Sequence, residues 1–440
     1  MRKIYYTIIL FVFFISSCGQ KENNDRLKHL SKEEIEKDFD QLTKIIETNV
    51  PTPFYSSSKS VYDSLKKAIS IDIPNYSSVK EVYKLFYPLV QTLNDAHFSI
   101  HLPDDFFSDS SKYFPLKVII QGNKLFIKEN LSVDKRIQNG DEIVKINSVS
   151  VKNIIDTIRS CNFKSASEEL FFEKWNEDFF YKRLAALFNT NSPFDIEMVS
   201  GQHFKISGIY ESLLKKDAVD KKEPSFKILD HKIGYLIIPS LDWNTQDGRI
   251  FFDKKIDSAF SFFQSNSVSD LVIDIRDNMG GSTLIAKDVL DYIYFKPYTL
   301  GLGETSFKNG VIKENTESNL HTPILHSNCF KGKTILLNNV LTYSSGHMMQ
   351  VGFQYYKMGK TIGEKSSEPL FITGEVHNIV LKNSGLQFYY GTSNFILPGF
   401  NKARKTYYVP DVVYTPTIKE QLAGGDILLK KAIATLIEDK

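Results

Sequence analysis

The stretch DLVIDIRDNMGGST, residues 270–283, decides the expected fold of this chain. Its first half is a continuous aliphatic run, which is typical of a strand buried on both faces within a parallel sheet. The run ends in polar residues that include Arg276 and Asn278, and Gly280 and Gly281 follow. Active sites in open α/β sheets gather at the carboxyl ends of parallel strands. The glycine pair is therefore either a turn that needs positive φ or a place where a substrate approaches the backbone closely.

Strands and helices alternate on both sides of this stretch. Such alternation predicts parallel strands covered by helices, so we expect residues 226–440 to form an α/β core. The expected strands are residues 232–241, 270–276, 333–340 and 360–364, and the expected helices are residues 248–265, 283–295, 344–356 and 426–437.

The segment before the core, residues 31–110, is expected to be mainly helical. Ser31 is a predicted N-cap, and the acidic residues after it suit the first turn of a helix. Apolar residues at helical spacing give this helix one apolar face, and Pro51 ends it. Two more amphipathic helices are expected at residues 60–69 and 77–93.

A β-rich module is expected over residues 111–210. Two strands are predicted around a turn at Gly122, and a second turn at Gly140 precedes a strand at residues 142–146. The pattern NGDEIVKINSVSV resembles the closing part of a PDZ-like domain, although another small β module would fit this segment too. PDZ-like domains bind peptide C-termini by adding a strand and cradling the carboxylate. The other expected segments are a helix at residues 151–158, a helical insert at 165–188, strands within 194–209 and a charged linker at 211–225.

The N-terminus has the pattern of an export signal. Two basic residues precede an apolar run, residues 4–15, which is too short for a stop-transfer helix and suits a signal peptide. The run leads to Ser-Ser-Cys18-Gly, which resembles the lipobox of bacterial lipoproteins; an ordinary secretory signal is the alternative. We therefore expect a lipoprotein signal peptide at residues 1–18, lipidation of Cys18 and a polar tether at residues 19–30. The expected location is the bacterial cell envelope, anchored by lipid to a membrane and facing the periplasm or the exterior.

Charge and cysteine content exclude several other classes of protein. The formal net charge of +2 gives no reason to expect a nucleic-acid partner. No group of cysteines and histidines has the spacing of a metal site, and no cofactor is implied. An exported protein permits a disulfide, but Cys161 and Cys329 lie in different predicted domains, so their pairing stays open.

The junction LTYSSGHMM supplies a candidate nucleophile. Ser344 and Ser345 follow an apolar strand and precede a helix, where free backbone N–H groups and the helix dipole favour negative charge. Such a place suits an attacking alkoxide and the oxyanion that it creates. The alternative is that these serines only cap the helix. Candidate bases are His97, at the end of the helical region, and His347, three residues beyond Ser344.

Five segments in one order resemble the tail-specific, or C-terminal-processing, serine peptidase family, which includes the tricorn protease core. The resemblance extends from about residue 30 to about residue 415 and implies a multi-domain α+β protein. Its parts would be the N-terminal helical region, the PDZ-like module and a ClpP/crotonase-like α/β core with parallel strands. The segments are LNDAHFSI, NGDEIVKINSVSV, GYLIIPSL, DLVIDIRDNMGGST, and KTILLNNVLTYSSGHMM followed by TIGE.

The resemblance implies roles for individual residues. Ser344 stands at the position of the family nucleophile, and the N–H groups of Ser345 and Gly280 stand at the oxyanion hole. One branch of the family uses a lysine as base, but Pro369 occupies that lysine's position here. The tricorn-like branch uses a histidine in a Leu-x-x-x-His segment, which His97 matches. The resemblance therefore implies Ser344 as nucleophile and His97 as general base.

The third catalytic residue has no match in the family pattern. The tricorn-like branch has a serine before the histidine and a glutamate before a late Pro-Asp, and neither is present here. Asp95, Glu364, His347 and Gly281 are the remaining candidates for supporting roles.

We expect an exported, lipid-anchored serine endopeptidase that cleaves polypeptides by acyl transfer, with a substrate held by its C-terminus. The alternative is a catalytically silent peptide-binding homologue of the same fold. A hydrolase of a non-peptide ester or amide is a third candidate, because the fold does not fix the acyl substrate.

Overall fold

The structure, a computed structural model, describes residues 28–438 apart from a few short segments. It shows a mixed α/β protein, as expected from the sequence. The predicted signal peptide, Cys18 and nearly all of the tether lie outside the described residues. The segments within 28–438 that are not described are residues 56, 108–110, 163–168, 189–191, 216–221, 309–310, 316–319 and 405.

The N-terminal region is built on three helices, as the apolar spacing predicted. Ser31 and Ser78 begin two of them with capping boxes, in which the serine side chain accepts a backbone N–H and a glutamate returns to the cap. The elements are β1 (His29–Ser31), α1 (Lys32–Asn49), α2 (Lys59–Ile71), β2 (Tyr76–Ser78), α3 (Val79–Gln91), β3 (Ser99–His101) and the short 3₁₀ turn Asp104–Phe106.

The β module follows, and its two predicted turns are present. Gly122 and Gly140 both have positive φ, which a residue with a side chain rarely adopts. The main sheet has the order β10-β9-β7-β6-β5, with β8 paired to β7, and β4 pairs separately with β11. The elements are β4 (Lys112–Tyr113), β5 (Leu116–Gln121), β6 (Lys124–Asn130), β7 (Glu142–Ile146), β8 (Val149–Ser150), α4 (Val151–Ser160), α5 (Glu169–Leu187), β9 (Phe194–Met198), β10 (His203–Ile206), β11 (Ile209–Tyr210) and α6 (Glu211–Leu214).

The α/β core is a six-stranded sheet in the order β12-β13-β14-β17-β18-β21. Only β12 is antiparallel to its neighbour; the other described pairs are parallel. The register pairs Ile237 with Asp274 and Asp274 with Leu337, so three strands end at one edge. The strands are β12 (Ser225–Leu229), β13 (Ile233–Ile237), β14 (Asp270–Asp274), β17 (Lys333–Asn338), β18 (Lys360–Gly363) and β21 (Val412–Val413).

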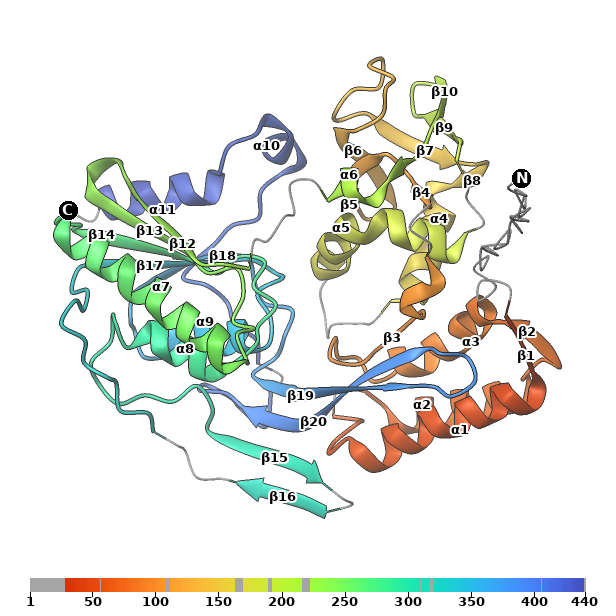
Figure 1. Ribbon diagram of the computed structural model, residues 1–440, viewed down its shortest axis with the longest axis horizontal. Helices are drawn as coiled ribbons and strands as arrows, with labels where there is room; N and C mark the ends of the chain where they lie inside the picture. Colours follow the sequence, from red (N-terminus) through yellow and green to blue (C-terminus); the bar gives the residue numbers. More distant parts are fainter. Residues whose placement is uncertain are drawn as a thin grey trace, which may run out of the picture.

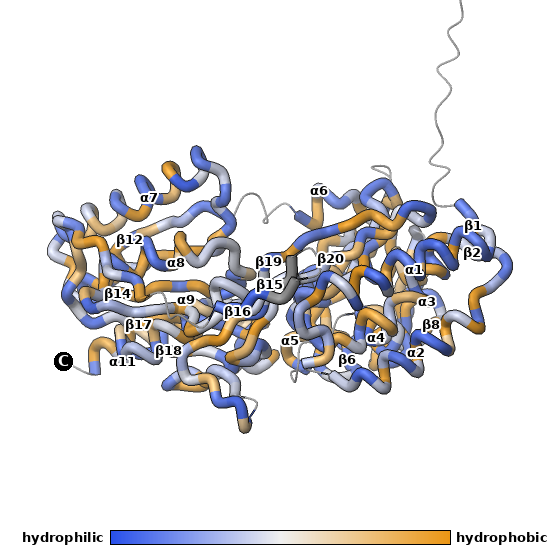
Figure 2. Tube along the Cα trace, turned by 90° about the horizontal axis from the view of Figure 1, so that it is seen from below, coloured by the Kyte–Doolittle hydropathy of each residue, from blue (hydrophilic) through white to orange (hydrophobic). Residues whose placement is uncertain are grey.

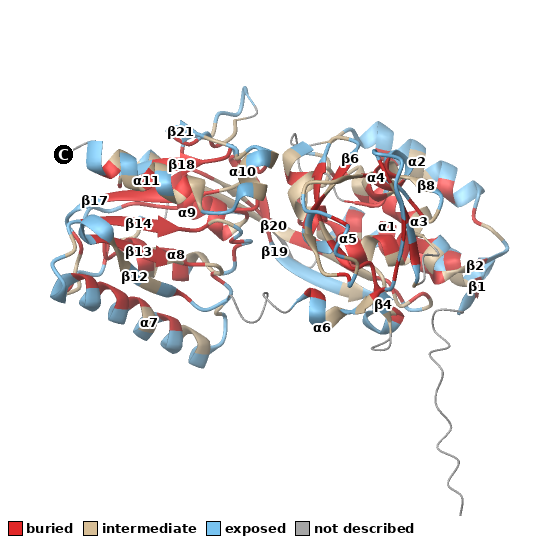
Figure 3. Ribbon diagram, turned by 90° about the horizontal axis from the view of Figure 1, so that it is seen from above, coloured by how far each residue is buried: buried red, intermediate tan, exposed pale blue. Residues whose placement is uncertain are grey.

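Helices cover both faces of this sheet, so β14 is buried along its whole length. Leu271 and Ile273 pack with α7, α8 and α9, whereas Val272 faces α11. Figure 3 shows α7 and α11 on opposite sides of the buried strands, and Figure 2 shows the hydrophobic segments of the chain between them. The helices are α7 (Gln246–Ser265), α8 (Thr283–Leu290), α9 (Ser345–Tyr355), α10 (Ile418–Ala423) and α11 (Ile427–Glu438), and a 3₁₀ turn spans Asp230–Lys232.

A long hairpin, β19 (Phe371–Val380) and β20 (Gln387–Ile396), joins the core to the N-terminal region (Figure 1). Its tip packs into the hydrophobic core that the helical region and the β module share. β3 pairs with β20, and Asp38 of α1 accepts N–H bonds from the hairpin turn. β20 also pairs with β15 (Gly303–Lys308), which pairs with β16 (Val311–Asn315). The hairpin therefore fixes the segment just before β3 against the α/β core.

Two further observations concern the whole described chain. Cys161 and Cys329 are both free. None of the helices within the described ranges is long and apolar enough to cross a membrane.

Candidate active site

Ser344 lies between the end of β17 and the start of α9. Its backbone has φ 52° and ψ −123°, and its side chain makes no capping hydrogen bond to the helix. A non-glycine residue in this conformation is strained, and such strain is found most often at functional sites. The interpretation of Ser344 as a simple helix cap is therefore wrong.

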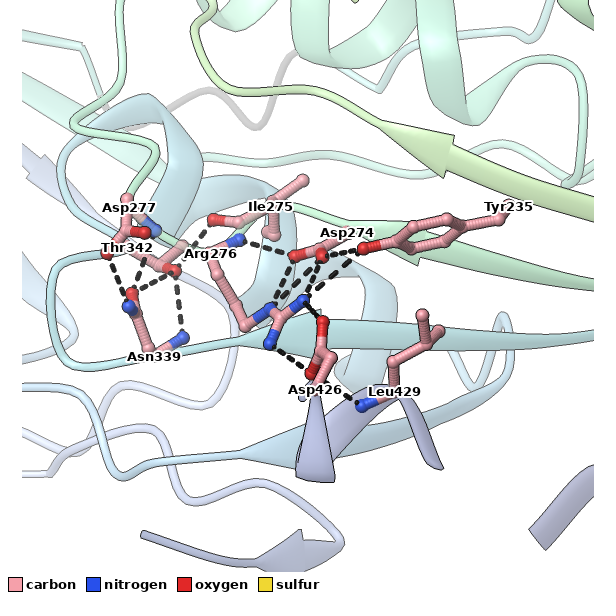
Figure 4. Close-up of polar contacts among 9 residues, drawn as sticks. All are labelled: Tyr235, Asp274, Ile275, Arg276, Asp277, Asn339, Thr342, Asp426 and Leu429. Atoms are coloured by element: carbon pink, nitrogen blue, oxygen red, sulfur yellow. Dashed lines mark hydrogen bonds and ion pairs between the residues drawn. The ribbon is translucent and has the colours of Figure 1, made fainter. Parts of the chain in front are cut away.

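The polar end of β14 holds the loops of this edge together (Figure 4). Arg276 forms ion pairs with Asp274 and Asp426, and its guanidinium also donates to the hydroxyl of Tyr235. The two carboxylates raise the pKa of Arg276 although burial opposes its charge. Arg276 thus joins the end of β14 to the start of α11. Its role is to hold the structure together, not to take part in catalysis.

A second set of bonds connects the loop after β14 to the loop before Ser344. Asn339 accepts the N–H of Asp277 and donates to its carboxylate, while Thr342 donates to the carbonyl of Ile275 (Figure 4). These bonds cross between the two strand ends, so they fix the loop before Ser344 against the loop after β14, which contains Gly280 and Gly281.

The glycine loop corrects one expectation from the sequence. The N–H of Gly280 donates to the side-chain oxygen of Asn278, 2.9 Å away, so it is not available to an oxyanion. Gly280 is buried, and a Cβ there would lie 2.7 Å from the Cβ of Ser344. Asn278 also donates to the carbonyl of Ile238. The side chain of Asn278 therefore uses the N–H that the family pattern assigned to catalysis.

The N–H of Gly281, in contrast, makes no hydrogen bond within the described part of the chain. The carbonyl of Gly280 accepts from Leu241 N at 3.0 Å, and in a trans peptide the following N–H points the opposite way, away from Leu241. In the next peptide the carbonyl of Gly281 accepts from Ser345 Oγ at 2.8 Å, so the side opposite Leu241 is the side on which Ser344 and Ser345 lie. Neither Gly281 N–H nor Ser345 N–H donates to any described residue. Both donors lie beside Ser344.

His97 comes from the N-terminal region, between the end of α3 and β3. Its Nδ1 lies 2.9 Å from Asp95 Oδ1, which also accepts the backbone N–H of His97. The imidazole is buried, and its Nε2 has no hydrogen-bond partner within the described ranges. With Nδ1–H donating to Asp95, Nε2 carries the lone pair of a base. The ring packs against Tyr343, the neighbour of Ser344, at 5.1 Å between centroids.

The environment of His97 determines its proton affinity. Burial lowers the pKa of His97, but the charge and hydrogen bond of Asp95 outweigh burial, so the pKa is raised overall. Burial likewise opposes the charge of Asp95, and the imidazole outweighs it and lowers the pKa of Asp95. Asp95 is thus a charged carboxylate that orients His97 and stabilises its protonated form. The sequence placed Asp95 among the candidates for this role.

Glu368 is a site residue that the sequence did not indicate. Its Oε2 accepts the backbone N–H of Ser344 at 2.6 Å, and its Oε1 lies 3.7 Å from His97 Nδ1. Burial, helped by the negative charge of Asp95, raises the pKa of Glu368 to about 8. No motif signals this role, because Glu368 adjoins Pro369 in a loop that departs from the family pattern.

The other two supporting candidates are structural. Glu364 accepts the N–H of Val340 at 2.9 Å, and no hydrogen bond joins it to His97. His347 is buried and bonds through Nε2 to the carbonyl of Pro369, and burial lowers its pKa to about 3. Because Ser366 also bonds to Nδ1 of His347, this histidine supports the loop that carries Glu368.

A cleft of about 790 Å³ brings these groups together. Ser344 and His97 both line it, as do Ser345 and Gly281, whereas Gly280 does not. Five consecutive residues of β19, residues 372–376, form one wall. In the part of the chain that the structure describes, no group of three or more metal-binding side chains could hold an ion.

One edge of the main sheet in the β module is covered by a helix. β5 is an edge strand, but the N–H groups of Ile120 and Gly122 donate to the carboxylates of Glu177 and Glu173 on α5. An incoming strand needs these same N–H groups. Strand addition at β5 is therefore blocked by α5.

A serine at a strand-to-helix junction and a histidine with a free Nε2 in the same cleft are the arrangement of an α/β serine hydrolase. Residues 232–414 match the model of peptidase family S41. The match lies in the α/β core, so this part of the chain is similar to the peptidases of that family, and the match supports a serine-type peptidase.

Solved structures show the same fold at low sequence identity. Mature CPAF complexed with lactacystin is 14% identical, covers 93% of this chain and 99% of its own, and has a TM-score of 0.66. A protein from Parabacteroides merdae ATCC 43184 is 13% identical, covers 92% of this chain and 97% of its own, and has a TM-score of 0.52. No curated protein sequence matches this chain.

Proposed function

We propose that this protein is an endopeptidase in which Ser344 is the nucleophile and His97 is the general base. His97 Nε2 takes the proton of the Ser344 hydroxyl as its oxygen attacks the peptide carbonyl, and returns it to the leaving amine. Asp95 holds Nδ1–H and stabilises the imidazolium between these steps. The N–H groups of Gly281 and Ser345 bind the oxyanion of the tetrahedral intermediate. Water then hydrolyses the acyl-enzyme.

The observation that carries this proposal is one cleft holding a strained serine and a histidine with a free Nε2. Ser344 does not cap its helix, and the bond of Asp95 to Nδ1 leaves Nε2 of His97 as the proton acceptor. No hydrogen bond joins Ser344 to His97 in this structure, and such bonds commonly tighten only when substrate binds. We therefore expect the side chains of Ser344 and His97 to move slightly closer together when substrate binds.

The substrate proposed for the cleft is an extended polypeptide. Residues 372–376 of β19 line the cleft, and β19 pairs only with β20 among the described strands. An extended chain would add to the outer edge of β19 and bring its carbonyl to Ser344.

We also propose that the protein is exported and held at a membrane surface by lipid on Cys18. This rests on the basic, apolar and Ser-Ser-Cys-Gly pattern of residues 1–19. Metabolic labelling with a fatty-acid probe tests it: label should be lost in Cys18→Ala and kept in Cys161→Ala.

Labelling with a serine-reactive fluorophosphonate and digestion of an unfolded protein test the peptidase proposal. Wild type should label and cleave, Ser344→Ala should do neither, and Ser282→Ala should resemble wild type. If wild type labels and cleaves no better than Ser344→Ala, the protein is the silent peptide-binding homologue instead.

A further inference from the structure

Glu375, on β19, is an exposed residue in the wall of the cleft that contains Ser344. Its backbone carbonyl accepts a hydrogen bond from Thr392 Oγ1 at 3.0 Å. Its side chain makes no hydrogen bond or ion pair with any residue in the described part of the chain. The carboxylate of Glu375 is therefore open to a partner from outside the chain.

Glu375 dominates the charge of the cleft. Among the described residues that line the cleft, no other is an aspartate, glutamate, lysine or arginine. Burial, together with the positive charge of Arg183 on α5, lowers the pKa of His101 to about 4, so this lining histidine is neutral at neutral pH. The other lining histidine, His97, is paired with Asp95, which balances its charge when it is protonated. A substrate in the cleft therefore meets the negative charge of Glu375.

The backbone of Glu375 departs from that of a regular strand. Its φ is 51°, in the left-handed region that residues with a side chain rarely adopt. The residues on either side of it, Gly374 and Val376, pair with β20, whereas Glu375 does not. Such strain at a non-glycine residue is found most often at functional sites. In β19 this strain lies at the residue that brings a charge into the cleft.

The rest of the cleft suits the stem of a long basic side chain. Val376, next to Glu375, is exposed, and much of the lining is apolar, with side chains such as Met279, Leu284 and Met348. Lysine and arginine place an apolar stem along such a surface and keep the charged end at a polar group. The cleft thus offers apolar contact for the stem and one carboxylate for the charged end.

Thr373 relates the position of Glu375 to that of the scissile bond. Thr373 precedes Glu375 by two residues on β19 and lies beside Asp95, the partner of His97. Two residues of a strand span about 7 Å. In a substrate strand added to β19, Glu375 therefore faces a residue about two positions from the bond held at Ser344.

We propose that Glu375 selects polypeptides that carry a lysine or arginine about two residues from the scissile bond. A substrate that fills the cleft removes water from Glu375, and burial of an unpaired carboxylate is unfavourable. A cationic side chain supplies the missing partner, a neutral one leaves the carboxylate unpaired, and an acidic one is repelled. The inference rests on the proposed function of the cleft and adds the class of substrate that the cleft accepts.

Binding is measured with the Ser344→Ala protein, so that cleavage does not intervene. The probes are short peptides of one sequence with a central Lys, Gln or Glu, followed by fluorescence anisotropy. Each peptide carries fluorescein on its N-terminus and an amide at its C-terminus, so the central side chain is the one charge that varies. The Lys peptide should bind about tenfold tighter than the Glu peptide, with the Gln peptide between them. Equal affinity of the three peptides would overturn the proposal.

Substitutions in the same Ser344→Ala protein locate the selecting charge. Glu375→Gln should bind the three peptides equally. Glu375→Lys should reverse their order, and a reversed order also shows that this variant is folded. Glu304→Gln is the matched control, because Glu304 lines a neighbouring cavity of about 160 Å³ and not the cleft, so the order should be kept. The wild-type order in either Glu375 variant, or its loss in Glu304→Gln, would show that another group selects the substrate.

This proposal and the peptidase mechanism fail separately. If Ser344→Ala prefers the Lys peptide but wild type cleaves nothing, the selection by Glu375 stands and the peptidase mechanism falls. Mass spectrometry of the fragments from an unfolded protein gives the opposite case. If wild type cleaves at bonds with no enrichment of lysine or arginine nearby, the mechanism stands and the selection by Glu375 falls.

Discussion

Glu368 Oε2 accepts the backbone N–H of Ser344 at 2.6 Å, so a buried carboxyl group holds the backbone of the proposed nucleophile. The same carboxyl group places Oε1 3.7 Å from His97 Nδ1. One side chain thus contacts both members of the proposed catalytic pair. Since the Ser344 backbone is strained, we infer that this bond helps to keep it in that conformation.

The role of Glu368 predicts a pH-dependent difference between two variants. Below a pH of about 8 the carboxyl group of Glu368 is protonated and neutral, as an amide is. Glu368→Gln should therefore label with fluorophosphonate at nearly the wild-type rate in this range. Above that pH wild type gains a negative charge near His97 that Gln lacks, and the two rates should diverge. Glu368→Ala loses the acceptor for Ser344 N–H and should label about tenfold more slowly or worse at every pH. A Gln variant as slow as Ala at pH 7 would contradict this role.

Asp95 should set the acid limit of activity. Burial lowers the pKa of His97 and Asp95 raises it above its ordinary value, so activity should appear only as pH rises through that raised pKa. Asp95→Asn removes the cause that raises it, and the acid limb should move to lower pH. The maximum rate should fall about a hundredfold or more, because the imidazolium loses its partner. Glu364→Gln is the control, since Glu364 bonds to Val340 and should leave the acid limb in place.

His347 should make the fold less stable in acid. Its pKa is about 3 in the folded protein against 6.5 for an unperturbed histidine. Between these values the unfolded chain binds a proton that the folded chain does not, so stability falls as pH falls from 6.5 toward 3, by up to about 1.4 kcal/mol per pH unit. His347→Gln should be less stable at pH 8 but have a flatter curve below 6.5, measured by urea unfolding. The exposed His377→Gln should reproduce the wild-type curve.

Arg276 should contribute to stability through its buried ion pairs. Arg276→Met leaves Asp274 buried without its cationic partner, so the free energy of unfolding should fall by roughly 3 kcal/mol. Arg136→Met removes an exposed pair with Asp134 and should change the stability little. Equal losses of unfolding free energy for the two substitutions would show that the buried ion pair stabilises the fold no more than the exposed one.

Much of the architecture followed from local pattern. Ser31 and Ser78 begin helices where capping and apolar spacing indicate them, and Gly122 and Gly140 mark turns of the β module. The aliphatic run of β14 is buried on both faces as its composition predicts. These features depend on neighbours a few residues apart, which is why the sequence reveals them.

The sequence also indicated the two residues that we propose for the chemistry. The strand-to-helix junction identified Ser344, and the Leu-x-x-x-His segment identified His97, although the two are far apart in the chain. What brings both to one cleft is the pairing of β3 with β20, a contact between distant segments.

Only the tertiary structure decided the remaining parts of the site. Whether Gly280 or Gly281 offers its N–H depends on which way one peptide faces, and Asn278 and Leu241 set that direction. The contact of Glu368 with Ser344 depends on the loop that carries Glu368, and buried His347 holds this loop through hydrogen bonds to Ser366 and Pro369. The sequence therefore determined which elements form and which residues could react, because those properties are local. Orientation and burial decided which groups act together, because they arise from packing between segments far apart in the chain.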